Sequence, residues 1–136
     1  MPAGGSRRPA SHETVDQRMH YVKQDGQTVF KFAVKKNQEI TMGLLERNNL
    51  TGSDIDLFVS HQANRRIIEA AAQRMGLSTD KVVINLEMFG NTTAGTIPLA
   101  LADARRSGRL KKGDLVLLAS VGAGFTVGSV LLRWSL

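Results

Sequence analysis

The chain has 136 residues and a formal net charge of +6, and 42% of its residues are hydrophobic. This length fits one domain, and the apolar share is large enough to bury a core, which excludes a disordered or fibrous chain. The excess of Lys and Arg favours an acidic partner, although a solvated basic surface accounts for it equally well.

The sequence also argues against several kinds of partner and compartment. No apolar run approaches the roughly 20 residues that span a bilayer, and residues 1–13 are unlike a secretory signal, so we expect a cytoplasmic protein without a membrane partner. The single Trp and single Tyr, without a zinc-finger or basic-zipper pattern, argue against nucleic acid. Because the chain has no cysteine, it cannot supply a disulfide or a thiolate by itself.

The predicted elements begin with a polar arm over residues 1–27, which is rich in Gly, Pro, Ser and Arg and is expected to be extended or irregular. Residues 28–34 alternate apolar and polar at first, which indicates a short strand or an extended lead-in to a helix. Apolar residues then favour a helix over 35–49.

Strands and helices alternate in the middle of the chain. Short apolar runs predict buried strands at 56–60 and 82–84, and the spacing of apolar residues predicts a helix over 64–75. A turn at 90–93 leads into a further helix that ends near Ser107.

Two more strands are predicted near the carboxy end, at 115–120 and 126–134, and their short connection makes them antiparallel. The order of the elements predicts an α/β fold with a mixed β-sheet flanked by helices. We therefore divide the chain into an amino-terminal arm, 1–27, and one domain, 28–136.

Two polar residues each follow a predicted strand and precede a predicted helix. They are His61 and Asn91, and ligands of α/β sheets bind at this edge. A lone His is more often structural, however, and Asn91 could simply cap the next helix. If both side chains reach one crevice, an imidazole N–H and an amide N–H would point at the same developing oxyanion.

Two further features are open to a functional or a plain interpretation. The small residues Gly122, Ala123 and Gly124 allow a ligand to approach the backbone, so an N–H here could be an oxyanion donor, or the segment is only a tight turn. Arg66 and Arg74 lie about two turns apart on one predicted helix face, which suits an acidic protein partner or a solvated surface.

Three motifs in this order resemble the second half of β-ketoacyl-acyl-carrier-protein synthase III, a condensing enzyme with the thiolase fold: HQANRRI at 61–67, GNTTA at 90–94 and GAGFT at 122–126. HQAN followed by GNT at this separation is more specific than either motif alone. Gly4-Gly5-Ser6 and Val29-Phe30-Lys31 also fit, so the resemblance covers nearly the whole chain and implies a thiolase-like half.

The resemblance implies a decarboxylative Claisen condensation that starts fatty-acid synthesis. In the family a Cys takes the acyl group from acyl-CoA as a thioester, and malonyl-acyl-carrier protein loses carbon dioxide to give the attacking enolate. His61 and Asn91 would hydrogen-bond the enolate oxygen, and the backbone N–H of Ala123 would hold the tetrahedral oxyanion. Phe89 and Val121 would neighbour the substrate tunnel. No cofactor and no metal are implied.

The resemblance also implies binding roles and partners. Asn64 would contact the pantetheine arm of coenzyme A, and Lys31, Arg66 and Arg74 would meet the acyl carrier protein. The Cys belongs to an amino-terminal half that this sequence does not include, so we expect the chain alone to be inactive. Without that half the apolar face between the halves is exposed, which predicts poor solubility, a homodimer or pairing with the Cys-bearing half.

Other assignments stay open from the sequence. Plant-type polyketide synthases also use Cys, His and Asn, so half of such an enzyme is an alternative. Elongating ketosynthases use two His, which Asn91 argues against, and hydroxymethylglutaryl-CoA synthase needs a Glu from the other half. From a different class, the chain could be a non-catalytic module that binds a carrier protein.

Overall fold

The computed structural model describes residues 1–136 and contains one three-stranded sheet of order β1-β2-β3. Strand β1 (Leu57–Ser60) pairs in parallel with β2 (Leu115–Gly122), and β2 pairs antiparallel with β3 (Thr126–Arg133). The predicted mixed sheet and the antiparallel final pair are therefore confirmed. No helix is both long enough and apolar enough to cross a membrane.

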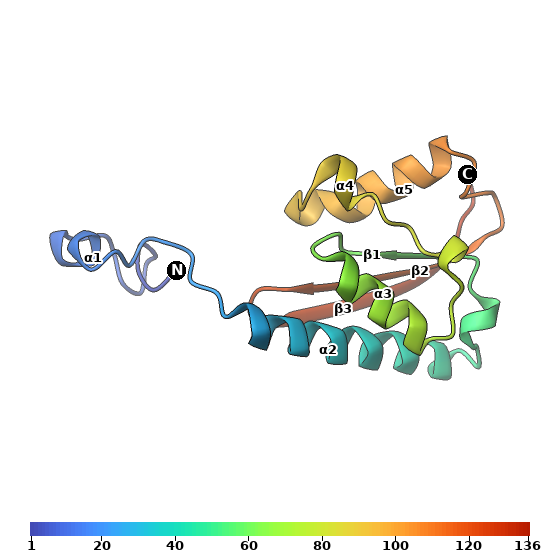
Figure 1. Cartoon of the computed structure of the whole chain (residues 1–136), viewed down its shortest axis with the longest axis horizontal. Coiled ribbons are helices and arrows are strands. Elements are labelled where there is room, and N and C mark those ends of the chain that lie inside the picture. Colours follow the sequence, from blue (N-terminus) through green and yellow to red (C-terminus); the bar gives the residue numbers. More distant parts are fainter.

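Helices cover both faces of this sheet, with α2 and α3 on one side and α4 and α5 on the other (Figure 1). The helical segments are α1 (His12–Asp16), α2 (Gly26–Arg47), α3 (Arg65–Arg74), α4 (Leu86–Phe89) and α5 (Thr96–Arg106), with 3₁₀ turns η1 (Gly52–Asp54), η2 (Thr79–Lys81) and η3 (Thr93–Gly95).

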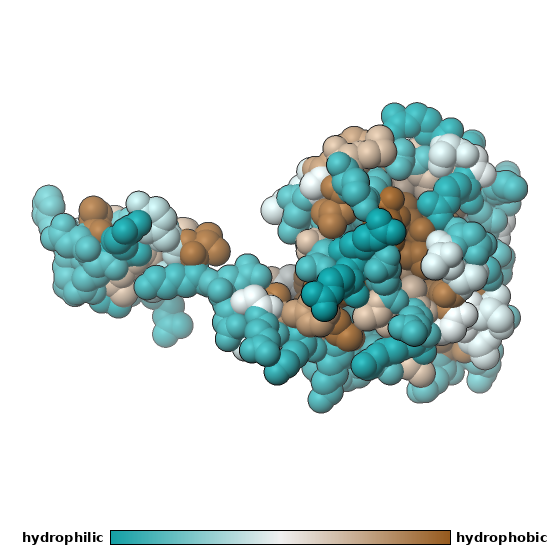
Figure 2. Space-filling view, in the orientation of Figure 1, coloured by the Kyte–Doolittle hydropathy of each residue, from teal (hydrophilic) through white to brown (hydrophobic).

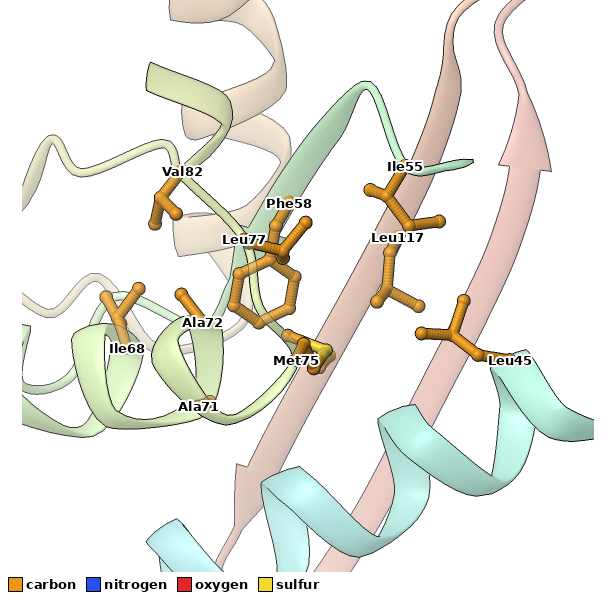
Figure 3. Packing of buried hydrophobic residues seen from close by; sticks show 11 residues of the cluster. Leu45, Ile55, Phe58, Ile68, Ala71, Ala72, Met75, Leu77, Val82 and Leu117 are labelled. Carbon is orange, nitrogen blue, oxygen red and sulfur yellow. The ribbon is translucent and has the colours of Figure 1, made fainter. Parts of the chain in front are cut away.

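The alternation of side chains along the strands divides the core between the two faces. Phe58 belongs to the cluster on the α3 side, whereas its neighbours Leu57 and Val59 pack in the cluster that includes α5. Figure 3 shows Phe58 pointing toward α3, with Leu77 and Met75 beside it. A four-residue strand buried on both faces thus anchors both helix layers.

The prediction of a strand or extended segment at 28–34 is wrong, because these residues form the first turns of α2. Asp25 caps the helix by accepting hydrogen bonds from the backbone N–H groups of Gln27 and Thr28, at 3.0 and 3.2 Å. The buried stripe recurs every four residues, and its members are Ala33, Asn37, Thr41 and Leu45. Two of these four residues are polar, so the spacing of the apolar residues alone does not reveal the helix.

The prediction of a strand at 82–84 is also largely wrong. Val82 makes only an isolated parallel bridge to Phe58, and the Val83 N–H donates to the Phe58 carbonyl at 3.0 Å. The chain then turns into α4, a helix that the sequence pattern did not predict. This segment nevertheless runs beside β1 and so brings Asn91 toward the end of that strand.

The arm extends away from the body of the molecule (Figure 1). It is not wholly irregular, since Ser11 caps α1 and the Ala3 N–H donates to the Met19 carbonyl at 3.2 Å. Figure 2 shows that most of its surface is hydrophilic. The arm joins α2 close to the site described next.

Candidate active site

A cleft of about 540 Å³ lies where the carboxy end of β1, the start of α2 and the β2–β3 connection meet. Its lining includes His61, Asn64, Asn91 and Ala123, which were singled out from the sequence. Residues from separate segments therefore converge on one hollow. Val121 also lines the cleft, but Phe89 does not. Phe89 lies at the end of α4, where 37% of its surface is exposed.

His61 is held at the strand end by its backbone and by its ring. Its N–H donates to the Ala119 carbonyl of β2 at 2.8 Å, and ring Nδ1 lies 2.6 Å from the Thr96 hydroxyl oxygen. Burial lowers the pKa of His61 below its ordinary value. The neutral imidazole is therefore the favoured form near neutral pH, and no hydrogen bond within the chain uses Nε2.

Asn91 and Asn64 share one arrangement in which the amide oxygen is occupied and the amide nitrogen is free. Asn91 Oδ1 accepts from the Thr93 N–H at 3.0 Å, and Asn64 Oδ1 accepts from the Arg66 N–H at 2.9 Å as the N-cap of α3. With the oxygen held by backbone, each Nδ2 is left to donate to a ligand in the cleft. Local capping and ligand binding are thus compatible at both residues.

The β2–β3 connection supplies backbone donors. Neither Ala123 nor Gly124 donates its N–H within the chain, while the Ala123 carbonyl accepts from the Thr126 hydroxyl at 3.1 Å. Gly124 has a φ of +138°, and a Cβ there would lie 3.1 Å from Thr126 Cγ2, so the turn requires glycine. Phe125 stacks on Phe32 of α2 with ring centroids 4.1 Å apart, which ties the connection to the helix.

Gln62 does not line the cleft, but it is a buried residue that supports the site and that the sequence reasoning missed. Its side chain is 1% exposed, and Nε2 donates to the carbonyls of Ser60 and Val83 at 2.8 and 3.1 Å. Its Oε1 accepts from the Asn85 N–H at 3.0 Å. Gln62 thereby joins the end of β1 to the segment that leads to Asn91. The available signal was a Gln two positions after an apolar strand, inside the HQAN motif.

Asn37 and Ser60 were also missed, and both lie in the cleft lining although they are buried. Asn37 Nδ2 donates to the Ser60 hydroxyl at 3.2 Å, while Asn37 Oδ1 has no partner within the chain. Asn37 lies in the buried stripe of α2, which also contains Thr41, and Ser60 is a polar interruption at the end of the apolar run of β1. That interruption was the only sign of Ser60 in the sequence.

The three basic residues predicted to bind a partner do not line the cleft. Lys31 and Arg66 are both exposed, and the Arg66 guanidinium sits 5.2 Å from the ring centroid of Phe30, the residue before Lys31. Arg74 lies at the far end of α3 and hydrogen-bonds Gln38 of α2. The structure thus packs Arg66, near the start of α3, against the first turns of α2, which contain Lys31, and places Arg74 at the other end of α3.

Two other observations bear on where the chemistry lies. A hollow of about 720 Å³ opens beside α3 on the face that Figure 2 shows, where apolar Ala72, Val82 and Ile84 lie among charged side chains. It is the larger of the two, but it contains none of the convergent donors, so we place the site in the cleft.

No group of three or more His, Asp or Glu side chains is arranged to hold a metal ion.

Comparison with known proteins gives one consistent family. The family described as the carboxy-terminal domain of 3-oxoacyl-[acyl-carrier-protein (ACP)] synthase III matches residues 45–134. A β-ketoacyl-[acyl-carrier-protein] synthase III of Koribacter versatilis is 64% identical over 135 residues, which cover 99% of this chain and 40% of that protein. The chain thus spans about two-fifths of the length of this curated relative.

Solved structures agree in fold. The crystal structure of 3-oxoacyl-[acyl-carrier-protein] synthase III from Aquifex aeolicus matches with a TM-score of 0.82 and 39% identity, over 85% of this chain and 38% of that one. The priming β-ketosynthase of the R1128 polyketide biosynthetic pathway matches with a TM-score of 0.78 and 32% identity, over 89% of this chain and 39% of that one. The thiolase-like half predicted from the motifs is confirmed at the level of fold.

Proposed function

Because the chain belongs to the family of the carboxy-terminal domain of 3-oxoacyl-[acyl-carrier-protein] synthase III, we propose that it supplies the His, the Asn and a backbone donor of a condensing site. The observation that carries this proposal is the convergence of His61, Asn91 and Ala123 on one cleft. The amide nitrogen of Asn91 and the N–H of Ala123 have no partner within the chain. The nucleophilic Cys would come from an amino-terminal half.

The proposed reaction has two stages. First, the acyl group moves from the sulfur of acyl-CoA to the Cys sulfur, and coenzyme A leaves as the thiol. The malonyl thioester of the acyl carrier protein then loses carbon dioxide, and its enolate carbon forms a bond to the acyl carbon. Collapse of the tetrahedral adduct breaks the Cys thioester and releases the β-ketoacyl product on the carrier protein.

This chain would stabilise the oxygen atoms that become negative in that sequence. Asn91 Nδ2 and protonated His61 Nε2 would donate to the enolate oxygen, and the Ala123 N–H would donate to the tetrahedral oxyanion. Donors held in place before charge develops cost no reorganisation, and loss of one typically costs about 2.7–4 kcal/mol of barrier. The backbone bonds that hold Asn91 and the β2–β3 connection support this role.

Substrate binding would use the rim of the cleft. Asn64 lines the cleft with a free Nδ2, which suits the amide carbonyls of a pantetheine arm. Lys31 and Arg66, with Arg74 further along α3, form an exposed basic surface that suits an acidic acyl carrier protein. Acyl-CoA, the carrier protein, the Cys-bearing half and a second copy of the enzyme are thus the proposed partners.

The experiment is a reconstituted condensation assay. The chain would be co-expressed with the amino-terminal segment of the Koribacter relative and assayed with acetyl-CoA and malonyl-acyl-carrier protein. His61→Ala and Asn91→Ala should each lower kcat about 100- to 1000-fold, with acyl transfer to the Cys retained. His12→Ala changes an exposed histidine of the arm and should have no effect. Unchanged condensation in His61→Ala would reject the proposed function.

A second candidate is the priming of a polyketide chain, which the likeness to the R1128 priming β-ketosynthase favours. The same three donors would serve, because the carbon–carbon bond is made in the same way. The candidates differ in the carrier protein that docks on Lys31 and Arg66. Parallel assays with fatty-acid and polyketide carrier proteins would separate them by kcat/KM.

A further inference from the structure

Thr96 makes two close polar contacts through a single hydroxyl group. Its oxygen lies 2.6 Å from His61 Nδ1 and 3.0 Å from the Thr93 carbonyl oxygen. Thr96 is the first residue of α5 and is 2% exposed, so water does not compete for either contact. One hydroxyl has one hydrogen, so it can donate to only one of these neighbours.

The carbonyl decides which neighbour receives that hydrogen. A carbonyl oxygen cannot donate, and two oxygens 3.0 Å apart without a hydrogen between them repel. The Thr96 hydroxyl therefore donates to Thr93 and has only lone pairs to offer His61. A neutral imidazole has one N–H, and the contact at Nδ1 is satisfied only when that nitrogen carries it.

We infer that Thr96 holds neutral His61 in the tautomer with hydrogen on Nδ1, so that Nε2 presents a lone pair in the cleft. Thr96 is thus a positioning residue that fixes the hydrogen-bonding character of His61. This inference rests on the proposed function, and it adds the order in which His61 takes up and donates a hydrogen. Before His61 can donate to a substrate oxygen, Nε2 must take up a proton from solvent, which makes the ring an imidazolium, and Nδ1–H keeps its bond to Thr96 throughout.

The same hydrogen bonds link His61 to Asn91. Thr93 donates its N–H to Asn91 Oδ1 and accepts from the Thr96 hydroxyl through its carbonyl. The polar character of both cleft residues is therefore set by one backbone residue, Thr93, and one hydroxyl. Asn91 is fixed as a donor through Nδ2, and resting His61 is fixed as an acceptor through Nε2.

The test is long-range ¹H–¹⁵N NMR of the histidine rings, recorded on this chain above the titration range of histidine. In the wild-type chain, His61 should show a protonated Nδ1 and an unprotonated Nε2. Thr96→Val removes the acceptor while keeping the shape, so the Nε2–H form should become the main one. Thr96→Ser keeps the hydroxyl and should restore the wild-type pattern. Thr92→Val, the matched change at an exposed threonine in the loop before α5, should leave His61 unchanged.

Two results would overturn the inference. One is an Nε2–H tautomer for His61 in the wild-type chain, which needs no variant to observe. The other is an unchanged tautomer in a Thr96→Val chain that keeps a dispersed amide spectrum. If Thr96→Val does not fold, loss of the Nδ1–H form in Thr96→Ser would count against the inference equally. Since this readout requires no turnover, its failure is distinct from loss of condensation in His61→Ala.

Discussion

At the scale of single residues, burial and a neighbour act on His61 in different ways. Thr96 fixes the position of the hydrogen on the neutral ring, whereas burial lowers the pKa of His61 below its ordinary value of about 6.5. His61 should therefore titrate below the ordinary pKa of histidine. An NMR titration that follows the His61 ring tests this, and a midpoint at or above the ordinary pKa of histidine would contradict it.

The lowered pKa of His61 also predicts how stability depends on pH. The unfolded chain takes up a proton at His61 near pH 6.5 (about the unperturbed value), while the folded chain takes it up only at lower pH. The contribution to the free energy of unfolding is therefore full above that pH and declines as pH falls toward the folded pKa. In urea denaturation series, the free energy of unfolding of His61→Gln should fall less than that of wild type as the pH is lowered from about 6.5 toward the folded pKa of His61. Parallel losses would argue against a shifted His61.

Gln62 makes a separate residue-scale prediction. Gln62→Leu keeps the volume but leaves the Ser60 and Val83 carbonyls and the Asn85 N–H without this partner in a buried region. Each buried group left unsatisfied costs about 1–3 kcal/mol, so urea denaturation should show a loss of at least that size. Gln73→Leu, on the exposed face of α3, should stay within about 0.5 kcal/mol of wild type.

The site was predictable from the sequence only in part. His61 could be found because it directly follows the apolar run of β1, whereas Asn91 was found from a predicted strand at 82–84 that makes only one bridge in the structure. Thr96 and Gln62 could not, because their functions depend on partners 35 and 23 positions away, namely His61 and Asn85. Such pairs are set by how α5 and the segment before α4 pack on β1, and no local pattern records that packing.

At the scale of elements, the alternation of strands and helices was predicted and their exact character was not. The segment 28–34 is helical because Asp25 caps α2 ahead of it. The buried stripe of α2 contains the polar residues Asn37 and Thr41. The segment 82–84 makes a single bridge rather than a ladder. The spacing of apolar residues shows which segments are buried. It does not reveal a helix whose buried face contains polar residues, and it does not show whether a buried segment pairs along its length with a strand.

The packing of η1 against α3 gives an element-scale prediction. A Cβ on Gly52 would lie 1.9 Å from the Met75 carbonyl oxygen, which is backbone and cannot turn away. Gly52→Ala should therefore force the two elements apart and cost about 1–3 kcal/mol or more by thermal or urea unfolding. Gly43→Ala is the matched change in α2, where the nearest atom is the end of the Arg47 side chain at 4.0 Å. It should stabilise the chain by about 0.4–1 kcal/mol.

Equal effects of the two Gly→Ala changes would contradict the packing of η1 on the end of α3. A large loss at Gly43 would equally contradict the open surface of α2 at that position. The pair is informative because the side chain added is the same, and only its surroundings differ.

At the scale of the whole molecule, the β3 side of the sheet is incompletely covered. Val127 and Val130 of the edge strand β3 are 41% and 51% exposed, and Phe125, just before that strand, is 45% exposed. Exposed apolar strands favour association with another chain. We therefore expect self-association in sizing chromatography, and Val130→Lys should raise the monomer fraction. A concentration-independent monomer in the wild-type chain would argue against this expectation.

The central claim is that this chain completes a condensing site when a Cys-bearing half joins it. The most direct measurement is β-ketoacyl product formation from acetyl-CoA and malonyl-acyl-carrier protein, with each half alone and with both together. We predict product only when both are present, from a complex that co-elutes. Stable association of the two halves, with the Cys acylated and no condensation product, would contradict the claim.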